Sequence, residues 1–262
     1  MKFFYILFFG VITFSCQKVI DVDVTDMEPK LVIEANYDAT NEIVTVNISK
    51  TRNVFGTSEI VRVSGASIEI INEVGDVEAL EDLGEGKYEL TNYAPTFLSS
   101  YQMRVDLDGV IYESSAFLPE VVPLDTLVSV FDPGSLFTSE GFVVFMGFQD
   151  PPGPNFYRAM RIVNGDTLEN RGAQFLFDDS FSEGNYQEVP FFSSRYEVGD
   201  TVTVELRSYS EDAFRFYIDL FNIAGDNGQS AAPANPTSSW TNDAFGHFAA
   251  WGFSGRTIII EE

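Results

Sequence analysis

The chain has 262 residues, and its 40 Asp and Glu against 15 Lys and Arg give a formal net charge of −25 at pH 7. Such an acidic surface repels phosphate backbones and anionic lipids, which argues against nucleic acid as a partner and against electrostatic attachment to a membrane. The 25 Phe and 11 Tyr residues, together with frequent Val, Ile and Thr, are typical of a β-rich globular protein.

The first 16 residues predict a bacterial lipoprotein signal. After one lysine, residues 3–14 form an apolar run that has the length of a signal peptide and is shorter than the ~20 residues that span a bilayer. Residues 13–16 resemble a lipobox, so we expect the signal peptide to be cleaved after Ser15 and Cys16 to carry the lipid. Two or three acyl chains, such as palmitate, would anchor the protein permanently. The alternative is an ordinary signal peptide followed by an incidental cysteine.

The mature chain is acidic and has no cysteine besides Cys16, so no disulfide and no Cys-ligated metal is expected. Without residues 1–15 it keeps 14 basic and 40 acidic side chains, a net charge of −26. Residues 16–29 are polar, and we expect them to form a tether that leads into the first strand.

Short runs with apolar side chains at every second position fill residues 30–118. In one of them Val44, Val46 and Ile48 share a face, and a hairpin signal stands at residues 108–109. The runs lie at residues 31–35, 43–48, 66–71, 87–90, 101–107 and 110–113. This pattern predicts an immunoglobulin-like β-sandwich. The alternative is that these strands share one larger sheet with the rest of the chain.

Residues 119–123 begin and end with proline, which favours extended backbone, and we place a hinge there. A second β-rich domain is expected over residues 124–262. Its predicted strands are residues 124–131, 142–149, 155–163, 174–177, 201–208, 244–253 and 257–260.

One amphipathic helix is predicted over residues 211–223 of this second domain. Ser210 is suited to cap its start, and Gly225 to end it. Phe214, Tyr217 and Ile218 belong to an apolar stripe with helical spacing, which indicates core packing and not a ligand site.

No catalytic or cofactor motif accompanies these elements, so we predict no catalytic residues. His247 is the single histidine, and neither a G-x-S-x-G elbow nor the several histidines of a zinc site are present. We therefore expect His247 to be structural. A carboxylate pair for glycoside hydrolysis is a spatial arrangement that a sequence with 40 acids does not reveal, so a hydrolase remains the third alternative.

Two features suggest binding. Residues 178–185 form the densest acidic loop, for which calcium binding is the alternative to plain solvation. Residues 226–241 form a long polar loop, and loops of this length are often functional. Trp240 in this loop and Trp251 beyond it are the candidate contacts for a ligand or partner, with core packing as the alternative.

Several segments together resemble outer-membrane lipoproteins of Bacteroidota, grouped as domain-of-unknown-function family 4249. These segments are residues 16–23, 29–35, 63–68, 86–90, 122–127, 148–153, 235–242 and 246–248. The resemblance implies an outer-membrane lipoprotein, often paired with a TonB-dependent receptor, without an assigned activity. Residues 17–18 also resemble the start of a surface-export signal, but the acids that normally follow are delayed, so display at the surface and a periplasmic orientation both remain open.

The expected function is therefore that of a lipid-anchored outer-membrane protein without enzymatic activity, which binds a ligand or assists a TonB-dependent receptor. A stand-alone protein that binds glycans or peptides at the cell surface is the alternative.

Overall fold

The computed structural model describes residues 28–51, 60–136, 138–168, 175–223 and 235–262. Sixteen strands and one helix form this part of the chain, so the predicted mainly-β class is confirmed. Within the same ranges no helix combines the length and hydropathy needed to cross a bilayer. The signal peptide, Ser15, Cys16 and most of the predicted tether lie outside the described residues.

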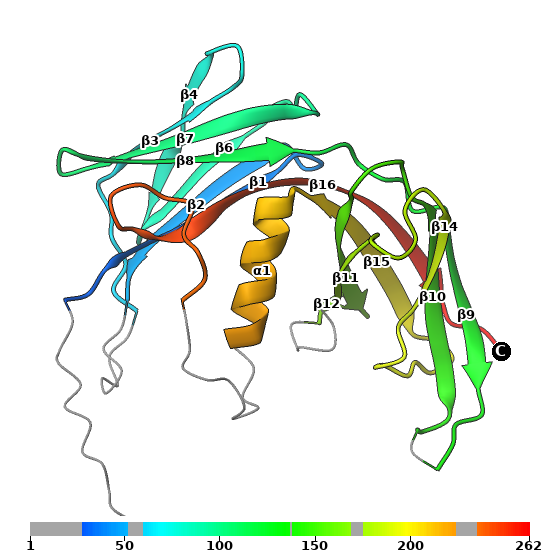
Figure 1. Ribbon diagram of the computed structural model, residues 1–262. Coiled ribbons are helices and arrows are strands. Elements are labelled where there is room, and N and C mark those ends of the chain that lie inside the picture. The colour runs from blue at the N-terminus through cyan, green and yellow to red at the C-terminus, as the bar shows by residue number, and fades with distance from the viewer. Residues whose placement is uncertain (1–27, 52–59, 137, 169–174, 224–234) are drawn as a thin grey trace, which may run out of the picture.

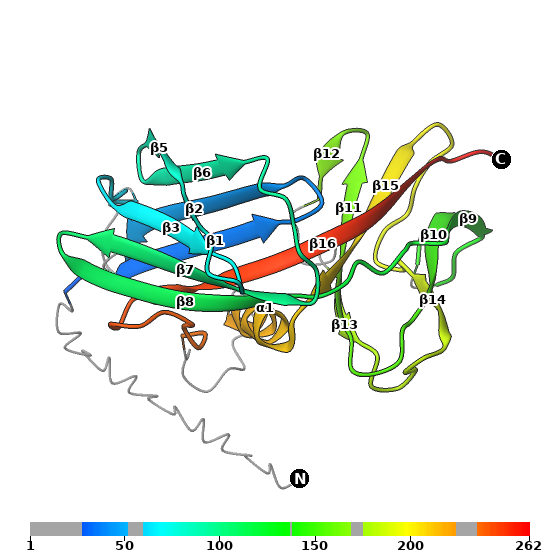
Figure 2. The same cartoon turned by 90° about the horizontal axis from the view of Figure 1, so that it is seen from above.

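The long strand β16 (Phe245–Ile259) connects the two halves of the molecule (Figure 2). Its residues 245–251 pair in parallel with β1 (Leu31–Asp38). Its residues 252–259 pair antiparallel with β15 (Thr201–Tyr209). One continuous sheet therefore passes through both halves of the chain.

Six further strands complete this sheet, in the order β12-β11-β15-β16-β1-β2-β6-β5, with β13 also paired to β11. They are β2 (Ile43–Lys50), β5 (Glu81–Gly84), β6 (Lys87–Thr91), β11 (Phe156–Val163), β12 (Asp166–Thr167) and β13 (Phe175–Asp178), which join β1, β15 and β16. In β2 the side chains of Val44, Val46 and Ile48 are buried, as the period-two pattern predicts.

Two smaller sheets pack against this large sheet (Figure 1). The first consists of β4 (Val77–Ala79), β3 (Ser67–Ile71), β7 (Ser99–Leu107) and β8 (Val110–Leu118), in that order. It shares a core with β1 and β2 that includes Ile33, Ile70 and Met103. The second consists of β14 (Tyr186–Pro190), β10 (Gly141–Gln149) and β9 (Thr126–Asp132), and it shares a second core with β11 and β15.

The helix α1 (Glu211–Ile223) has the bounds that the sequence predicts. The backbone N–H of Ala213 donates to Ser210 Oγ at 3.4 Å, and Glu211 and Asp212 in the first turn suit the positive end of the helix dipole. Phe214 packs against the large sheet, in a cluster with Tyr209, Ala249 and Trp251. Figure 1 shows α1 lying beneath the arch of this sheet.

Some strand pairings differ from the sequence prediction. The strands expected at residues 244–253 and 257–260 are one strand, β16, and four short strands (β4, β5, β12 and β14) were not predicted. Because β16 pairs with β1, the large sheet contains strands from the chain before and after the hinge placed at 119–123. The division into domains at this hinge stays a prediction.

Candidate functional site

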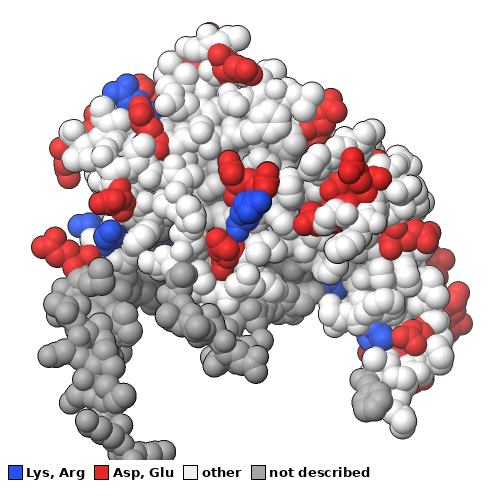
Figure 3. All heavy atoms as spheres, viewed as in Figure 1, with Lys and Arg blue, Asp and Glu red and all other residues white. Residues whose placement is uncertain are grey.

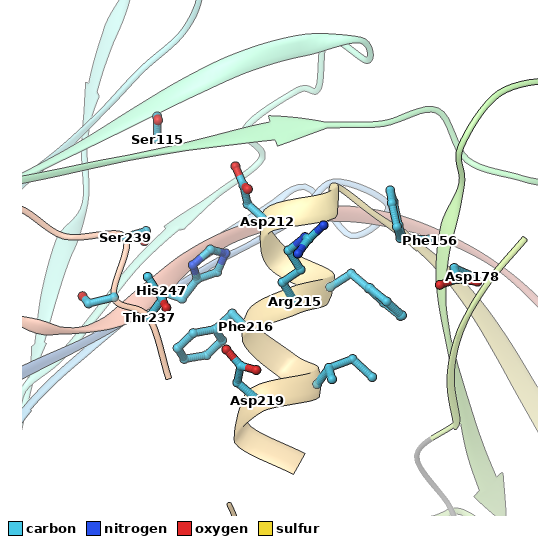
Figure 4. A pocket seen from close by; sticks show the side chains of 13 residues that line it. Ser115, Phe156, Asp178, Asp212, Arg215, Phe216, Asp219, Thr237, Ser239 and His247 are labelled. Atoms are coloured by element: carbon cyan, nitrogen blue, oxygen red, sulfur yellow. The ribbon is translucent and has the colours of Figure 1, made fainter. Parts of the chain in front are cut away.

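A hollow of about 670 Å³ lies beside α1, between the helix, the segment 237–239 and the start of β16 (Figure 4). This volume lies in the range of sites that hold small molecules. Its lining combines carboxylates, hydroxyls and aromatic rings, and it includes Asp212, Phe216 and His247. The mixture is suited to a ligand that has both polar and apolar parts.

The deepest polar group of the hollow is the imidazole of His247, which is only 7% exposed. Figure 4 shows the ring directed from β16 toward α1, between Ser239 and Asp212. It stacks on the ring of Phe216 with 4.8 Å between centroids and 13° between planes. Its Nε2 atom has no hydrogen-bond partner among the described residues. Burial lowers the pKa of His247 to about 4, although Asp212 opposes the shift, so the imidazole is neutral at pH 7.

The backbone of β16 explains why His247 faces the helix. Side chains alternate along a strand, so Phe248 and Ala250 enter the core between the sheets while Ala249 and Trp251 face α1. Gly246, with φ of 113°, lies so close to β1 that a Cβ atom there would stand 2.0 Å from Ile33 O. Only glycine allows this approach.

The segment 237–239 is held against β16 by its serines. Ser238 Oγ donates to Ala244 O at 2.6 Å, and Ser239 Oγ accepts from the backbone N–H of Phe248 at 3.1 Å. Ser239 Oγ also bonds to Ser114 Oγ at 2.7 Å, which ties the segment to β8. The wall of the hollow opposite α1 is therefore fixed by hydrogen bonds.

Three carboxylates give the hollow a negative lining: Asp178 at the end of β13, and Asp212 and Asp219 on α1. Among the described residues of the lining, the one cation is Arg215, whose guanidinium forms an ion pair of 2.5 Å with Glu211 one turn earlier. Figure 3 shows acidic groups spread over this side of the molecule, with few basic groups among them.

The two tryptophans predicted as contacts occupy different places. Trp240 is 6% exposed and donates its Nε1–H to Ile33 O at 2.9 Å, so it packs in the core of the N-terminal half. Trp251 lines a smaller hollow of about 380 Å³ on another side of α1. Its ring packs against Tyr209 at 5.5 Å and lies under the Arg207 guanidinium, also at 5.5 Å. Trp240 therefore fits the core alternative, whereas Trp251 borders the smaller hollow and its role as a ligand contact stays a prediction.

The acidic loop 178–185 is tied into the structure by its neighbours. Asp179 accepts from the backbone N–H of Asn155 at 3.0 Å. Asp150, 1% exposed, accepts from Tyr157 Oη at 2.5 Å and from Gly184 N at 2.8 Å. Burial and the hydrogen bond to Asp150 raise the pKa of Tyr157. Across the described ranges no three His, Cys, Asp or Glu side chains gather in a way that could hold a metal ion.

The hollow brings together residues that the sequence did not single out. Asp212 and Phe216 lie on the face of α1 away from its predicted apolar stripe, and residues 237–239 lie in the long loop for which only Trp240 was named. The polar side of an amphipathic helix is ordinarily solvated, so it carries no separate signal in a sequence. The length of the loop 226–241 was the one feature of the sequence that pointed to a functional site in this region.

Comparisons with known proteins give a family and no activity. The model of a family described as "Domain of unknown function (DUF4249)" matches residues 17–251. No curated protein matches the chain. A structure titled "Cytokine receptor complex - Crystal form 1A" is 10% identical, with 87% of this chain and 95% of that chain covered and a TM-score of 0.28. A pullulanase complexed with maltotriose from Anoxybacillus sp. LM18-11 is 10% identical, with 68% and 24% covered and a TM-score of 0.23.

Proposed function

This chain belongs to DUF4249, a family of unknown function, and on that premise we propose that it is a lipid-anchored binding protein of the bacterial outer membrane. It acts without enzymatic activity and serves a TonB-dependent receptor. The signal at residues 1–15 and the cysteine that follows support the anchor. The observation that carries the binding role is the hollow beside α1, with a buried imidazole that lacks a partner within the described structure.

The geometry of this hollow favours binding over catalysis. A hydrolytic serine needs a histidine that takes its proton, and His247 instead stacks on Phe216. The hydroxyls of Ser238 and Ser239 are bonded to the backbone of Ala244, just before β16, and of Phe248 within it. These contacts argue against a serine hydrolase. A stand-alone protein that binds glycans or peptides is the second candidate, and a hydrolase that uses a carboxylate pair is the third.

We also propose that the N-terminal half, residues 30–118 together with the first half of β16, is an immunoglobulin-like β-sandwich. Two facing sheets that share one core support this assignment. The contribution of β16 means that this sandwich would take a strand from the distant part of the chain.

The anchor is tested by labelling cells with radioactive palmitate. We expect the wild-type protein to carry the label and to sediment with membranes, and the C16A variant to lose both properties because no acyl chain can be attached. An unlabelled wild-type protein, or a C16A variant that sediments equally well, would contradict the proposal.

The receptor role is tested separately by mild solubilisation of the membranes. Recovery of the lipoprotein together with a TonB-dependent receptor is expected, and recovery without one would favour the stand-alone alternative. Proteolysis of intact cells decides the orientation, because only a protein displayed at the surface is digested.

A further inference from the structure

We propose that the hollow beside α1 binds a protonated amine that is attached to a small apolar group, such as the amino end of a short peptide. This inference rests on the proposed binding role and names the ligand class. Three independent properties of the hollow lead to it: its charge, its unpaired imidazole and its apolar side chains.

The charge of the lining selects against anions. Of the residues that the structure describes there, Asp178, Asp212 and Asp219 contribute three negative charges, and the one positive charge, on Arg215, pairs with Glu211. The whole chain adds a field of net charge −25. A cation is attracted both by the nearby carboxylates and by the net charge of the whole chain, and a carboxylate or phosphate is repelled.

The imidazole of His247 supplies a hydrogen-bond acceptor that is already desolvated. The ring is more than nine-tenths buried, and its Nε2 finds no partner in the described ranges. A neutral imidazole has one nitrogen with a free lone pair, and an ammonium group is a donor without acceptor capacity. Because neighbouring atoms cover Nε2, the His247 side chain must turn toward the hollow for a ligand to reach it. A donor there would then relieve part of the cost of leaving a buried polar group unpaired.

Aromatic rings lie among these charges: Phe156 is the register partner of Asp178, and Phe216 lies on the face of α1 that carries Asp212 and Asp219. Phe156, Phe216 and Ile218 line the hollow and are half-buried, so their exposed edges gain by contact with an aliphatic or aromatic group. The Phe156 ring packs against the ring of Phe214, which also lines the hollow, with 5.1 Å between centroids. An ammonium group next to a hydrophobic side chain fits this mixture of rings and carboxylates.

Calorimetric titration of the full-length protein in detergent micelles tests the inference. The probe is alanyl-phenylalanyl-alanine amide with a free amino end, compared with the same peptide after acetylation, and phenethylamine distinguishes a peptide ligand from any apolar amine. We expect the free-amine peptide to bind and the acetylated peptide to bind at least tenfold more weakly, because acetylation removes the charge-assisted hydrogen bonds.

Two variants localise the effect. D212N/D219N should weaken the free-amine peptide about tenfold or more, and His247→Phe, which keeps the stacked ring but loses the acceptor, about fivefold. The matched control is E78Q/E81Q, which removes the same charge from exposed positions on β4 and β5. It should leave the affinity within about twofold.

The inference is overturned if neither amine probe binds, if the acetylated peptide binds equally well, or if D212N/D219N keeps the wild-type affinity. It is also overturned if E78Q/E81Q weakens binding as much as D212N/D219N does, since the overall field would then explain the effect. Failure of the proposed anchor is seen in the palmitate experiment, which does not depend on any of these titrations.

Discussion

His247 occupies a position where a nonpolar ring would pack as well. Its imidazole lies flat against Phe216, and Nε2 has no partner in the part of the chain that is described. An unpaired buried polar atom costs about 1–3 kcal/mol of stability. A ligand that donates to this atom would offset the cost.

Replacement of His247 by Phe should raise stability, and more so in mild acid. The unfolded chain binds a proton near pH 6.5, whereas burial lowers the pKa of the folded His247 to about 4. Wild-type stability therefore falls as the pH decreases from 6.5 to about 4, by up to about 3 kcal/mol from this residue. Urea unfolding of both proteins at pH 7, 5.5 and 4 measures the difference in free energy, which should grow toward low pH. Parallel stability curves would contradict it.

For single residues, the sequence predicts whether a side chain is structural better than it predicts which site the side chain belongs to. The structural assignment of His247 agrees with its burial, but its place in a hollow depends on Phe216 and Ser239, which reach it from other segments. Trp240 was predicted as a contact because it stands in a polar loop. The sequence does not distinguish an exposed tryptophan there from one that, as here, donates to Ile33 O, 207 positions away.

The elements divide according to whether local or distant interactions form them. The bounds of α1 were predicted because its cap and its apolar stripe are encoded within 14 residues of sequence, 210–223. The parallel pairing of β16 with β1 could not be predicted, since no short-range pattern specifies which distant strand a segment will join. All the predicted strands overlap observed ones, whereas the pairing order came only from the structure.

Gly246 is the point at which this pairing is most easily broken. In G246A the new Cβ would meet the backbone of Ile33 at a φ of 113°, so we expect a loss of about 3 kcal/mol or more in the free energy of unfolding. The matched control is G255A in the same strand, where the nearest heavy atom to a Cβ is Val204 O at 3.5 Å and the expected change is within about 1 kcal/mol. Urea titration compares the two, and equal losses would show that close approach at Gly246 is not the cause.

The whole molecule is dominated by its negative charge. With 40 acidic and 15 basic side chains, most carboxylates have no basic partner to pair with, and the folded state is destabilised by its own repulsion. The lipid anchor and the receptor role stay predictions at this scale, because Cys16 lies outside the described residues and no described contact bears on a partner.

Sodium chloride should therefore stabilise the protein at pH 7. Raising its concentration from 0.01 M to 0.5 M shortens the Debye length from ~30 Å to about 4 Å, which screens the repulsion between carboxylates. We expect the Tm to rise by several degrees, at roughly 2–4 °C for each kcal/mol gained. The same titration near pH 4, where many carboxylates are protonated, should give a much smaller rise, and a rise of equal size would point to a cause other than charge.

The route of β16 through both halves also sets the order in which the protein can mature. The β1 strand cannot gain its parallel neighbour until residues more than 200 positions later have been synthesised, so its edge remains open while the intervening chain emerges. Such distant contacts slow folding. For the export proposed above, a chain that cannot complete its N-terminal half early would stay unfolded for longer, which is the state that a secretion channel requires.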